Sequence, residues 1–315
     1  MAVRFRGEND VITALAGGVG AAKFLTGLVK IVSQKELSVI VNTGDDIELF
    51  GLHISPDIDI VSYTLAGIVD ETKGWGIKED TFHFLNAAKK FGVETWFNIG
   101  DRDLATHVYR TARLKQGLKL SEVTAEISRA LGLEVAVLPM TDNKFETRIV
   151  TPEGTMHFEE YMVKREAKDT VLGVEFSGAE SAEPAQGVIS AVENAECVVV
   201  CPSNPVVSIG TILAVRGVRE ALRRTKARKV AISPIIGGAP VKGPADKLLR
   251  GLGREVSAFA VAELYADFLD VFVLDAVDAV EKNRVERLGM EVRVTDTVMR
   301  SLEDKVRLAR VVLEK

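Results

Sequence analysis

The sequence is poor in the residues that build disulfides and cysteine- or histidine-based sites. Its 315 residues include 2 cysteines and 4 histidines. Cys197 and Cys201 fall along one apolar strand, where residues four apart share a face but lie too far apart to bridge easily. We expect both to pack in the core, and a metal site there would need further ligands nearby. No Ser-His-Asp order or Cys-His pair indicates a nucleophile system.

Long apolar runs and an excess of positive charge are also missing. No apolar stretch approaches the roughly 20 residues that a membrane-spanning helix needs. Residues 1–10 carry charges and lack the apolar core of a signal peptide, so we expect a cytoplasmic location. The net charge of -5 argues against a general nucleic-acid binder, because binding the phosphate backbone usually needs a basic face. We therefore expect neither a membrane nor a nucleic acid as a partner.

What is present is an alternation of apolar strands and helical patterns, which is typical of an α/β fold. The strands expected for the main sheet are 11–16, 37–41, 134–138, 197–200, 229–232, 271–274 and 291–294. The expected helices are 21–28, 60–66, 80–90, 104–115, 120–131, 209–224, 245–252, 280–288 and 302–313. This spacing predicts a Rossmann-like, mostly parallel sheet with helices on both faces.

We expect a single α/β domain over 1–315, with 60–190 as an inserted helical and hairpin subdomain. Inside that insertion, strands 147–151 and 156–161 flank a Pro-Glu-Gly turn, which predicts a hairpin. The polar segment 164–186 is the least regular and is expected to be a surface excursion.

Ligands of such sheets bind beyond the carboxyl ends of the strands, so the loops there are the candidate sites. The first such loop is Gly17-Gly18-Val19-Gly20, between a buried strand and a helix. Glycines let the backbone approach a ligand closely, and the helix start favours a phosphate. The spacing fits neither the G-x-G-x-x-G dinucleotide pattern nor a P-loop. The alternative is an ordinary tight turn.

Acidic residues follow the next strand. Asp45 and Asp46 come directly after Gly44, and Asp57 and Asp59 follow soon after. Residues two apart in an extended chain point the same way, so Asp57 and Asp59 could share one divalent cation. The alternative is that one of them caps the helix that begins near Ile60.

The segment 100–110 predicts a helix with a polar face. Asp103, Thr106, His107 and Arg110 would share one side, and Asp101 or Asp103 would cap the helix. Arg102 or Arg110 could hold a phosphate through its fork of N–H donors. The alternatives are a solvated face and a structural histidine at position 107.

Two later loops place small hydroxyl and amide groups just before helix starts. The candidates for holding a nucleotide are Ser203, Asn204 and Ser208 in one loop and Ser233 in the other. For Ser208, helix capping is the alternative. No catalytic nucleophile is needed, because a cation with fixed donors suffices for phosphoryl-type transfer.

Taken together, six ordered motifs resemble the 2-phospho-L-lactate transferase family across nearly the whole chain. The motifs are Ala16–Phe24, Asn42–Asp46, Ser55–Asp59, Gly100–His107, Pro202–Pro205 and Ser233–Gly237. The resemblance implies an enzyme of coenzyme F420 biosynthesis. The terminal hydroxyl of the deazaflavin alcohol Fo (7,8-didemethyl-8-hydroxy-5-deazariboflavin) would attack a guanosine diphospho-donor, releasing GMP and forming the glutamate-free precursor. Mg²⁺ would be the cofactor and a homodimer the expected state.

The resemblance and the residues together imply roles at the site. The catalytic residues would be Asp45, Asp59 and Arg102, and the metal ligands Asp45, Asp46 and Asp59. Trp75 would stack on the deazaflavin ring, or else be an ordinary packing aromatic. The substrate-binding set would be Gly17, Gly18, Gly20, Asp57, Trp75, Asp103, His107, Ser203, Asn204, Ser208 and Ser233.

Two other functions are compatible with parts of the sequence. A sugar-nucleotide-binding regulatory protein of the same fold would share the glycine loop without transferring anything, but the segments 100–103 and 141–147 favour the transferase. A dinucleotide oxidoreductase is disfavoured by the glycine spacing. The three-carbon acid of the donor, phospholactate or phosphoenolpyruvate, stays open.

Overall fold

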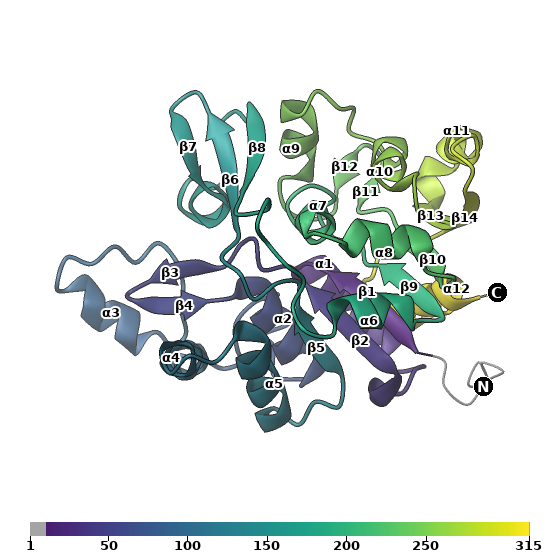
Figure 1. Ribbon diagram of the computed structural model, residues 1–315. Coiled ribbons are helices and arrows are strands. Elements are labelled where there is room, and N and C mark those ends of the chain that lie inside the picture. Colours follow the sequence, from purple (N-terminus) through teal and green to yellow (C-terminus); the bar gives the residue numbers. More distant parts are fainter. Residues whose placement is uncertain (1–10, 315) are drawn as a thin grey trace.

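A computed structural model describes residues 11–314. The stretch 1–10, in which we saw no signal peptide, lies outside the described residues. Seven parallel strands form the main sheet in the order β14-β13-β10-β9-β1-β2-β5 (Figure 1). The strands are β1 (Ile12–Ala16), β2 (Leu37–Val41), β5 (Ala136–Pro139), β9 (Cys197–Val200), β10 (Arg228–Ile232), β13 (Val271–Asp275) and β14 (Glu291–Thr295). The predicted α/β fold class is confirmed.

The central strands are continuous apolar runs because both of their faces are covered. β1 lies between β2 and β9, with Ile12 level with Leu37 and Cys197. Successive residues alternate between two buried cores. Leu15 enters one of them, and its neighbour Ala14 enters the other.

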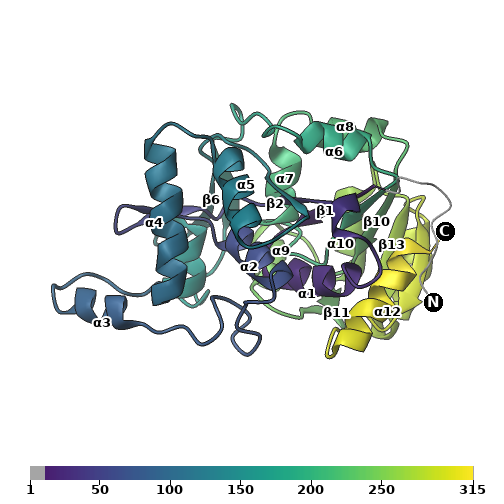
Figure 2. The same cartoon turned by 90° about the horizontal axis from the view of Figure 1, so that it is seen from below.

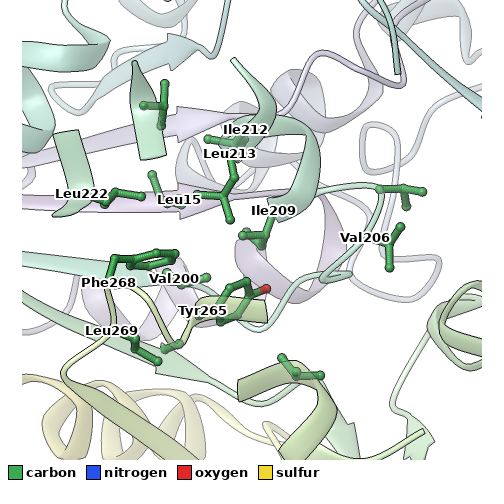
Figure 3. Close-up of a cluster of buried hydrophobic side chains, with 14 of the residues drawn as sticks. Leu15, Val200, Val206, Ile209, Ile212, Leu213, Leu222, Tyr265, Phe268 and Leu269 are labelled. Carbon is green, nitrogen blue, oxygen red and sulfur yellow. The ribbon is translucent and has the colours of Figure 1, made fainter. Parts of the chain in front are cut away.

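Helices cover both faces of the sheet. One core is closed by α1 (Val19–Leu28), α2 (Pro56–Leu65) and α12 (Leu302–Leu313). Figure 2 shows α1 and α12 side by side. The other core is closed by α6 (Val188–Glu193), α7 (Ile209–Ala214), α8 (Val218–Arg224), α9 (Ala245–Gly251), α10 (Ala258–Tyr265) and α11 (Lys282–Glu286). In that second core, Leu15 and Val200 of the sheet meet Ile209 of α7 and Tyr265 of α10 (Figure 3).

Some helix predictions need correction. The single helix expected over 209–224 is two helices, because Gly217 takes a left-handed conformation with φ of 81° and starts α8. The helix expected over 280–288 begins instead as the 3₁₀ segment η3 (Ala276–Glu281), which runs into α11. Helix α10 was not predicted; Ser257 caps it by accepting a hydrogen bond from the Ala260 N–H.

The segment 60–190 is only partly separate from the main sheet. It contains α3 (His83–Lys89), α4 (Asp101–Lys115) and α5 (Leu120–Ala130), but its strand β5 pairs with β2 as the edge of the main sheet. An antiparallel sheet of β6 (Glu146–Thr151), β7 (Gly154–His157) and β8 (Gly173–Ser177) stands apart from the parallel sheet (Figure 1). The β6–β7 hairpin was predicted, whereas β8 lies within the expected surface excursion.

The strand predicted over 156–161 ends early, at His157. The chain continues as the π-helical turn η2 (Glu160–Lys164). The remaining short elements are η1 (Gln34–Glu36), the hairpin of β3 (Ile47–Leu49) with β4 (Leu52–Ile54), and the hairpin of β11 (Ile235–Ile236) with β12 (Ala239–Pro240). Both cysteines are buried and free, as expected. Among the helices described, none has the length and apolarity to cross a membrane.

Candidate functional site

A cavity of about 530 Å³ opens at the carboxyl edge of the parallel sheet. Loops that follow five strands contribute to its wall: Gly18 after β1, Asp45 after β2, Asn204 after β9, Ser233 after β10 and Thr297 after β14. The turns that sequence analysis singled out therefore converge. The predicted site residues lining the cavity are Gly18, Gly20, Asp45, Asp57, Asp59, Trp75, Asp103, His107, Ser203, Asn204, Ser208 and Ser233.

Three predicted site residues are not among those that line the cavity. Gly17 is a packing position, because a Cβ there would lie 2.5 Å from Ser208 Oγ, and its N–H donates to Ser203 Oγ at 3.1 Å. Asp46 accepts hydrogen bonds from Ser55 Oγ at 2.7 Å and His53 Nε2 at 2.9 Å. Arg102 is exposed and donates to the Lys78 carbonyl oxygen at 3.0 Å.

The glycine loop brings the start of α1 to the cavity. A Cβ at Gly18 would lie 2.5 Å from Asp57 Oδ1, and one at Gly20 would lie 2.2 Å from the Pro202 carbonyl oxygen. Only glycine permits these two close approaches. The N-cap residue, Gly18, has no side chain to cap α1, and Gly18, Val19 and Gly20 line the cavity, so no capping side chain from that residue competes for the first N–H groups of the helix. Such a helix start is suited to an anion.

Asn42, at the end of β2, organises the acidic residues. Its Nδ2 donates to Asp45 Oδ2 and to Asp57 Oδ2, both at 2.9 Å. Its Oδ1 accepts from the Gly44 N–H at 2.8 Å and from Thr211 Oγ1 at 2.7 Å. One amide therefore holds two carboxylates together at the cavity wall. The other oxygen of Asp45, Oδ1, is buried and meets no donor at hydrogen-bonding geometry within residues 11–314, although the Thr147 side chain lies near enough to lower the pKa of Asp45.

Glu159 adds a third carboxylate to this wall, which sequence analysis did not foresee. It follows the β6–β7 hairpin, is 8% exposed and lines the cavity. Burial, and then the charges of Asp57 and Glu159, raise the pKa of Asp45 well above its usual range. Burial followed by nearby carboxylates raises the pKa of Glu159 to about 8, and burial raises that of Asp57 to about 7. No salt bridge within residues 11–314 compensates the charge of Asp45, Asp57 or Glu159.

The expectation that Asp57 and Asp59 share a cation from an extended chain is wrong. Helix α2 begins at Pro56, so both aspartates are helical. Two helical positions turn a side chain by about 200°, which points the two carboxylates in different directions. Asp57 faces Asn42, and Asp59 faces Arg110. Neither caps the helix, because α2 has no side-chain cap.

The polar face predicted on α4 points inward and forms a buried network with α2. Arg110 is fully buried and donates to both oxygens of Asp59, with Nη1 3.0 Å from Oδ2. Arg110 Nη1 also lies 3.3 Å from His107 Nδ1, and His107 Nε2 lies 3.4 Å from Asp103 Oδ1. Tyr63 donates to the same Asp103 oxygen at 2.8 Å.

This network leaves little room for a cation at Asp59. Potential ligand atoms of Asp59, Asp103 and His107 lie within 4.8 Å of one another. The Arg110 guanidinium already neutralises Asp59 through both oxygens, and a metal would be repelled by its charge. Burial raises the pKa of Asp103, but its contacts with His107 and Tyr63 outweigh burial and leave that pKa lowered. We therefore assign the network to holding α2 against α4 under the cavity.

The starts of α3 and α4 are capped by aspartates from elsewhere in the chain: Asp80 caps α4, and Asp101 caps α3. Asp80 accepts from the N–H groups of Arg102 at 2.8 Å and Asp103 at 3.0 Å, so it caps α4. Asp101 accepts from the N–H groups at the start of α3, both at 2.9 Å. The prediction that Asp101 or Asp103 caps α4 is therefore wrong.

The later loops contribute polar groups with defined partners. Asn204 Oδ1 accepts from the Val206 N–H at 3.0 Å and so shapes its own loop. Ser208 occupies the N-cap position of α7, but its side chain makes no capping hydrogen bond. Ser233 Oγ donates to the Ile235 carbonyl oxygen at 2.8 Å.

Positive charge lies at the rim of the cavity. Two lysines, Lys23 of α1 and Lys242, are exposed and line it. Partial burial of the Lys242 ammonium group, followed by the charge of Lys23, lowers the pKa of Lys242. No carboxylate within residues 11–314 forms a salt bridge with either lysine. Trp75 is half-buried at the same cavity, with Lys73 Nζ 5.6 Å from its ring centroid.

These features define a class of protein. A helix start without a capping side chain, a group of buried carboxylates and the two lysines without a salt bridge in residues 11–314 meet at one edge of a parallel sheet, as in α/β proteins that bind anionic ligands there. Residues 12–312 match the family described as 2-phospho-L-lactate transferase CofD. The chain belongs to this family and is a transferase of this kind.

The chain is similar over nearly its whole length to relatives of two kinds, named 2-phospho-L-lactate transferase and phosphoenolpyruvate transferase. A 2-phospho-L-lactate transferase of Methanosarcina mazei is 42% identical over 299 residues, covering 95% of this chain and 98% of the relative. A phosphoenolpyruvate transferase of Streptomyces coelicolor is 44% identical over 305 residues, covering 95% and 96%.

A solved structure, of a UPF0052 family protein from Bacillus halodurans, has a TM-score of 0.66 and covers 98% of this chain and 100% of that one. Its sequence identity is 15%, so this likeness concerns the fold alone.

Proposed function

We propose that this enzyme transfers a phospholactyl or phosphoenolpyruvyl group from a guanosine diphospho-donor to the terminal hydroxyl of the deazaflavin alcohol Fo. The hydroxyl oxygen forms a bond to the phosphorus next to the three-carbon acid. The bond from that phosphorus to the GMP oxygen breaks, and the hydroxyl proton is lost. The products are GMP and a phosphodiester, the glutamate-free precursor of coenzyme F420.

The observation that carries this proposal is the contact between the glycine loop and Asp57. Asp57 Oδ1 lies 2.5 Å from the position that a Cβ of Gly18 would take, at the start of α1. A diphosphate bound to these N–H groups would therefore lie beside the carboxylates that Asn42 holds. Such a neighbourhood suits a reaction in which an anionic phosphorus group is positioned and its charge is stabilised.

The remaining walls fit the two substrates. The loops of Ser203, Asn204 and Ser233 line the same cavity as the start of α1 and would hold the guanosine part of the donor. Trp75 offers an aromatic face for the deazaflavin ring. A volume of about 530 Å³ is in the range of ligand pockets.

The residues present fit a magnesium ion, with a revised set of ligands. Asp45 has a buried oxygen that meets no hydrogen-bond donor within residues 11–314. The Asn42 side-chain amide donates to both Asp45 and Asp57 and so holds the two carboxylates near each other. Mg²⁺ prefers such oxygen ligands and is often shared with substrate phosphates. We propose Asp45 and Asp57 as the ligands in place of Asp59, whose oxygens Arg110 engages. When bound, the ion would neutralise charge on the transferring phosphoryl oxygens.

The test is a reconstituted assay with Fo, the lactyl or enolpyruvyl diphosphoguanosine donor and Mg²⁺. We expect the phosphodiester by mass spectrometry and an equal amount of GMP, with no GMP release when Fo is omitted. Absence of the phosphodiester with both donors contradicts the proposal. Calorimetric binding of a UDP-sugar without turnover would then indicate the regulatory protein of the same fold. Comparing the rates with the two donors identifies the three-carbon acid.

The homodimer is also part of this proposal. Light scattering of the purified protein, with and without Fo, tests it directly. A mass close to the 34.2 kDa of one chain would contradict it.

A further inference from the structure

We propose that Glu159 is a third carboxylate ligand of the cation at Asp45 and Asp57, and that His157 fixes its position. The inference rests on the magnesium site of the proposed function. It assigns part of that site to the small antiparallel sheet, which lies far from the glycine loop in sequence.

Glu159 has the properties of a side chain that lacks its partner. It is 8% exposed, lines the cavity and comes just after Phe158, which follows the end of β7. Within residues 11–314, no donor and no basic side chain is found to pair with its carboxylate. A buried carboxylate without a partner is costly, so such groups are normally paired or bound to a metal.

The groups that surround Glu159 are of its own charge. Asp45, Asp46 and Asp57 all interact electrostatically with it. Asp45 contributes the buried oxygen without a hydrogen-bond partner. Because these carboxylates come from different elements and repel one another, a cation bound between them would offset their repulsion.

His157 ties the Glu159 turn to the acidic loop after β2. Its Nε2 lies 3.1 Å from the Asp46 carbonyl oxygen, and its Nδ1 accepts from the Glu159 N–H at 3.1 Å. A ring that accepts at Nδ1 and donates at Nε2 is the neutral tautomer. One imidazole therefore joins the backbones on both sides of the cation site.

A second contact between the small antiparallel sheet and the acidic loop involves strand β6. The Thr147 N–H, in β6, donates to the Gly44 carbonyl oxygen at 2.6 Å. A Cβ at Gly44 would lie 2.6 Å from Thr147 Oγ1, so the two segments are in close contact. The small sheet is thus fastened to the acidic loop at two points, which sets the distance of Glu159 from Asp45.

The test measures cation binding, with Mn²⁺ as a spectroscopic substitute for Mg²⁺. Electron paramagnetic resonance titrations of the full chain with GDP present would compare the parent protein with the Glu159→Gln variant. We expect Glu159→Gln to weaken Mn²⁺ binding at least about tenfold. The matched control is Glu160→Gln. The adjacent glutamate is 39% exposed and pairs with Lys164 at 3.6 Å, and its loss should leave the affinity unchanged.

The outcomes separate this inference from the proposed function. A parent protein that binds no Mn²⁺ overturns the magnesium site and the inference together. If the parent protein binds Mn²⁺ but the Glu159→Gln variant binds it equally tightly, the inference alone is overturned. Normal Mn²⁺ affinity with lost turnover in Glu159→Gln would instead make Glu159 a proton acceptor, which also overturns the ligand role.

Melting temperatures guard against a folding defect. In the absence of metal, Glu159→Gln should melt at or above the temperature of the parent protein, because one repelling charge is removed. It should also gain less from added Mg²⁺. His157→Phe should weaken Mn²⁺ binding several-fold, and His157→Asn, which keeps polar groups, should weaken it less. Equal Mn²⁺ affinity in both His157 variants and the parent would overturn the positioning role.

Discussion

Asp59 and Arg110 form a two-point ion pair that joins α2 to α4 beneath the cavity. The guanidinium is fully buried, and Asp59 is 5% exposed. This pair changes what a substitution of Asp59 should do. From the sequence we expected a catalytic role for Asp59. In the structure Asp59 instead pairs with Arg110, whose buried charge would have no partner without it.

We predict that Asp59→Asn lowers the free energy of unfolding by about 3–5 kcal/mol, because it leaves Arg110 charged, buried and unpaired. Urea denaturation monitored by circular dichroism measures this loss. The double variant Asp59→Leu with Arg110→Met should recover much of it, because both charges leave together. If Asp59→Asn is as stable as the parent and still inactive, Asp59 returns to a direct role in the reaction.

Asp45 and Asp57 should behave in the opposite way. We predict that Asp45→Asn and Asp57→Asn each reduce turnover at least about 100-fold, as expected when charge stabilisation in the transition state is lost. Stability without metal should not fall, because each change removes repulsion from neighbouring carboxylates. The control is Glu48→Gln, an exposed carboxylate on the nearby β3. Activity retained in Asp57→Asn would contradict the revised metal site.

The metal-free protein should lose stability as the pH rises from about 5 to about 8. The pKa values of Asp57 and Glu159 are raised to about 7 and about 8 in the folded chain, mainly by burial. Between the unfolded and folded pKa values the folded state holds more protons, so unfolding becomes easier as the pH rises. Melting temperatures in EDTA should therefore fall by several degrees across this range.

Added Mg²⁺ should flatten that pH dependence, because the ion replaces the protons. Its affinity should increase from pH 6 to pH 8, which calorimetry can measure. A melting temperature in EDTA that is constant with pH would show that these carboxylates are already compensated.

Lys23 and Lys242 should contribute to binding of the diphosphate. We predict that Lys23→Gln and Lys242→Gln each weaken GDP binding about five- to tenfold, the cost of one charge-assisted contact of about 1–1.4 kcal/mol. GMP, with one phosphate fewer, should be affected less. The control is Lys30→Gln, which removes an equal charge just beyond the end of α1, away from the cavity lining. Equal effects of all three substitutions on GDP binding would indicate only a general field effect.

Much of the fold could be predicted because its strands and helices are encoded locally. The runs at 37–41, 197–200 and 302–313 match β2, β9 and α12 residue for residue. Parallel strands also bring their following loops to one edge, which is why distant turns could be expected to converge.

The errors concern contacts that depend on tertiary packing or on helix starts. Helix α2 begins at Pro56, and proline is a favoured first residue of a helix. We expected the helix to begin near Ile60, which left Asp57 and Asp59 in an extended segment where they could share one cation. No local pattern links Asp59 to Arg110 or Asp45 to Glu159, since these pairs are far apart in the chain. The exchanged caps of Asp80 and Asp101 depend likewise on how α3 folds back on α4.

The side-chain amide of Asn42 has both of its N–H groups engaged by carboxylates. Both hydrogens of its nitrogen are donated to carboxylates and its oxygen accepts from the Gly44 N–H, so the orientation of the amide is fixed. Aspartate at this position would offer no proton to either neighbour, and glutamine would carry the amide one methylene too far. The uncharged Asn42 therefore determines how close the Asp45 and Asp57 carboxylates lie in the absence of a bound ion.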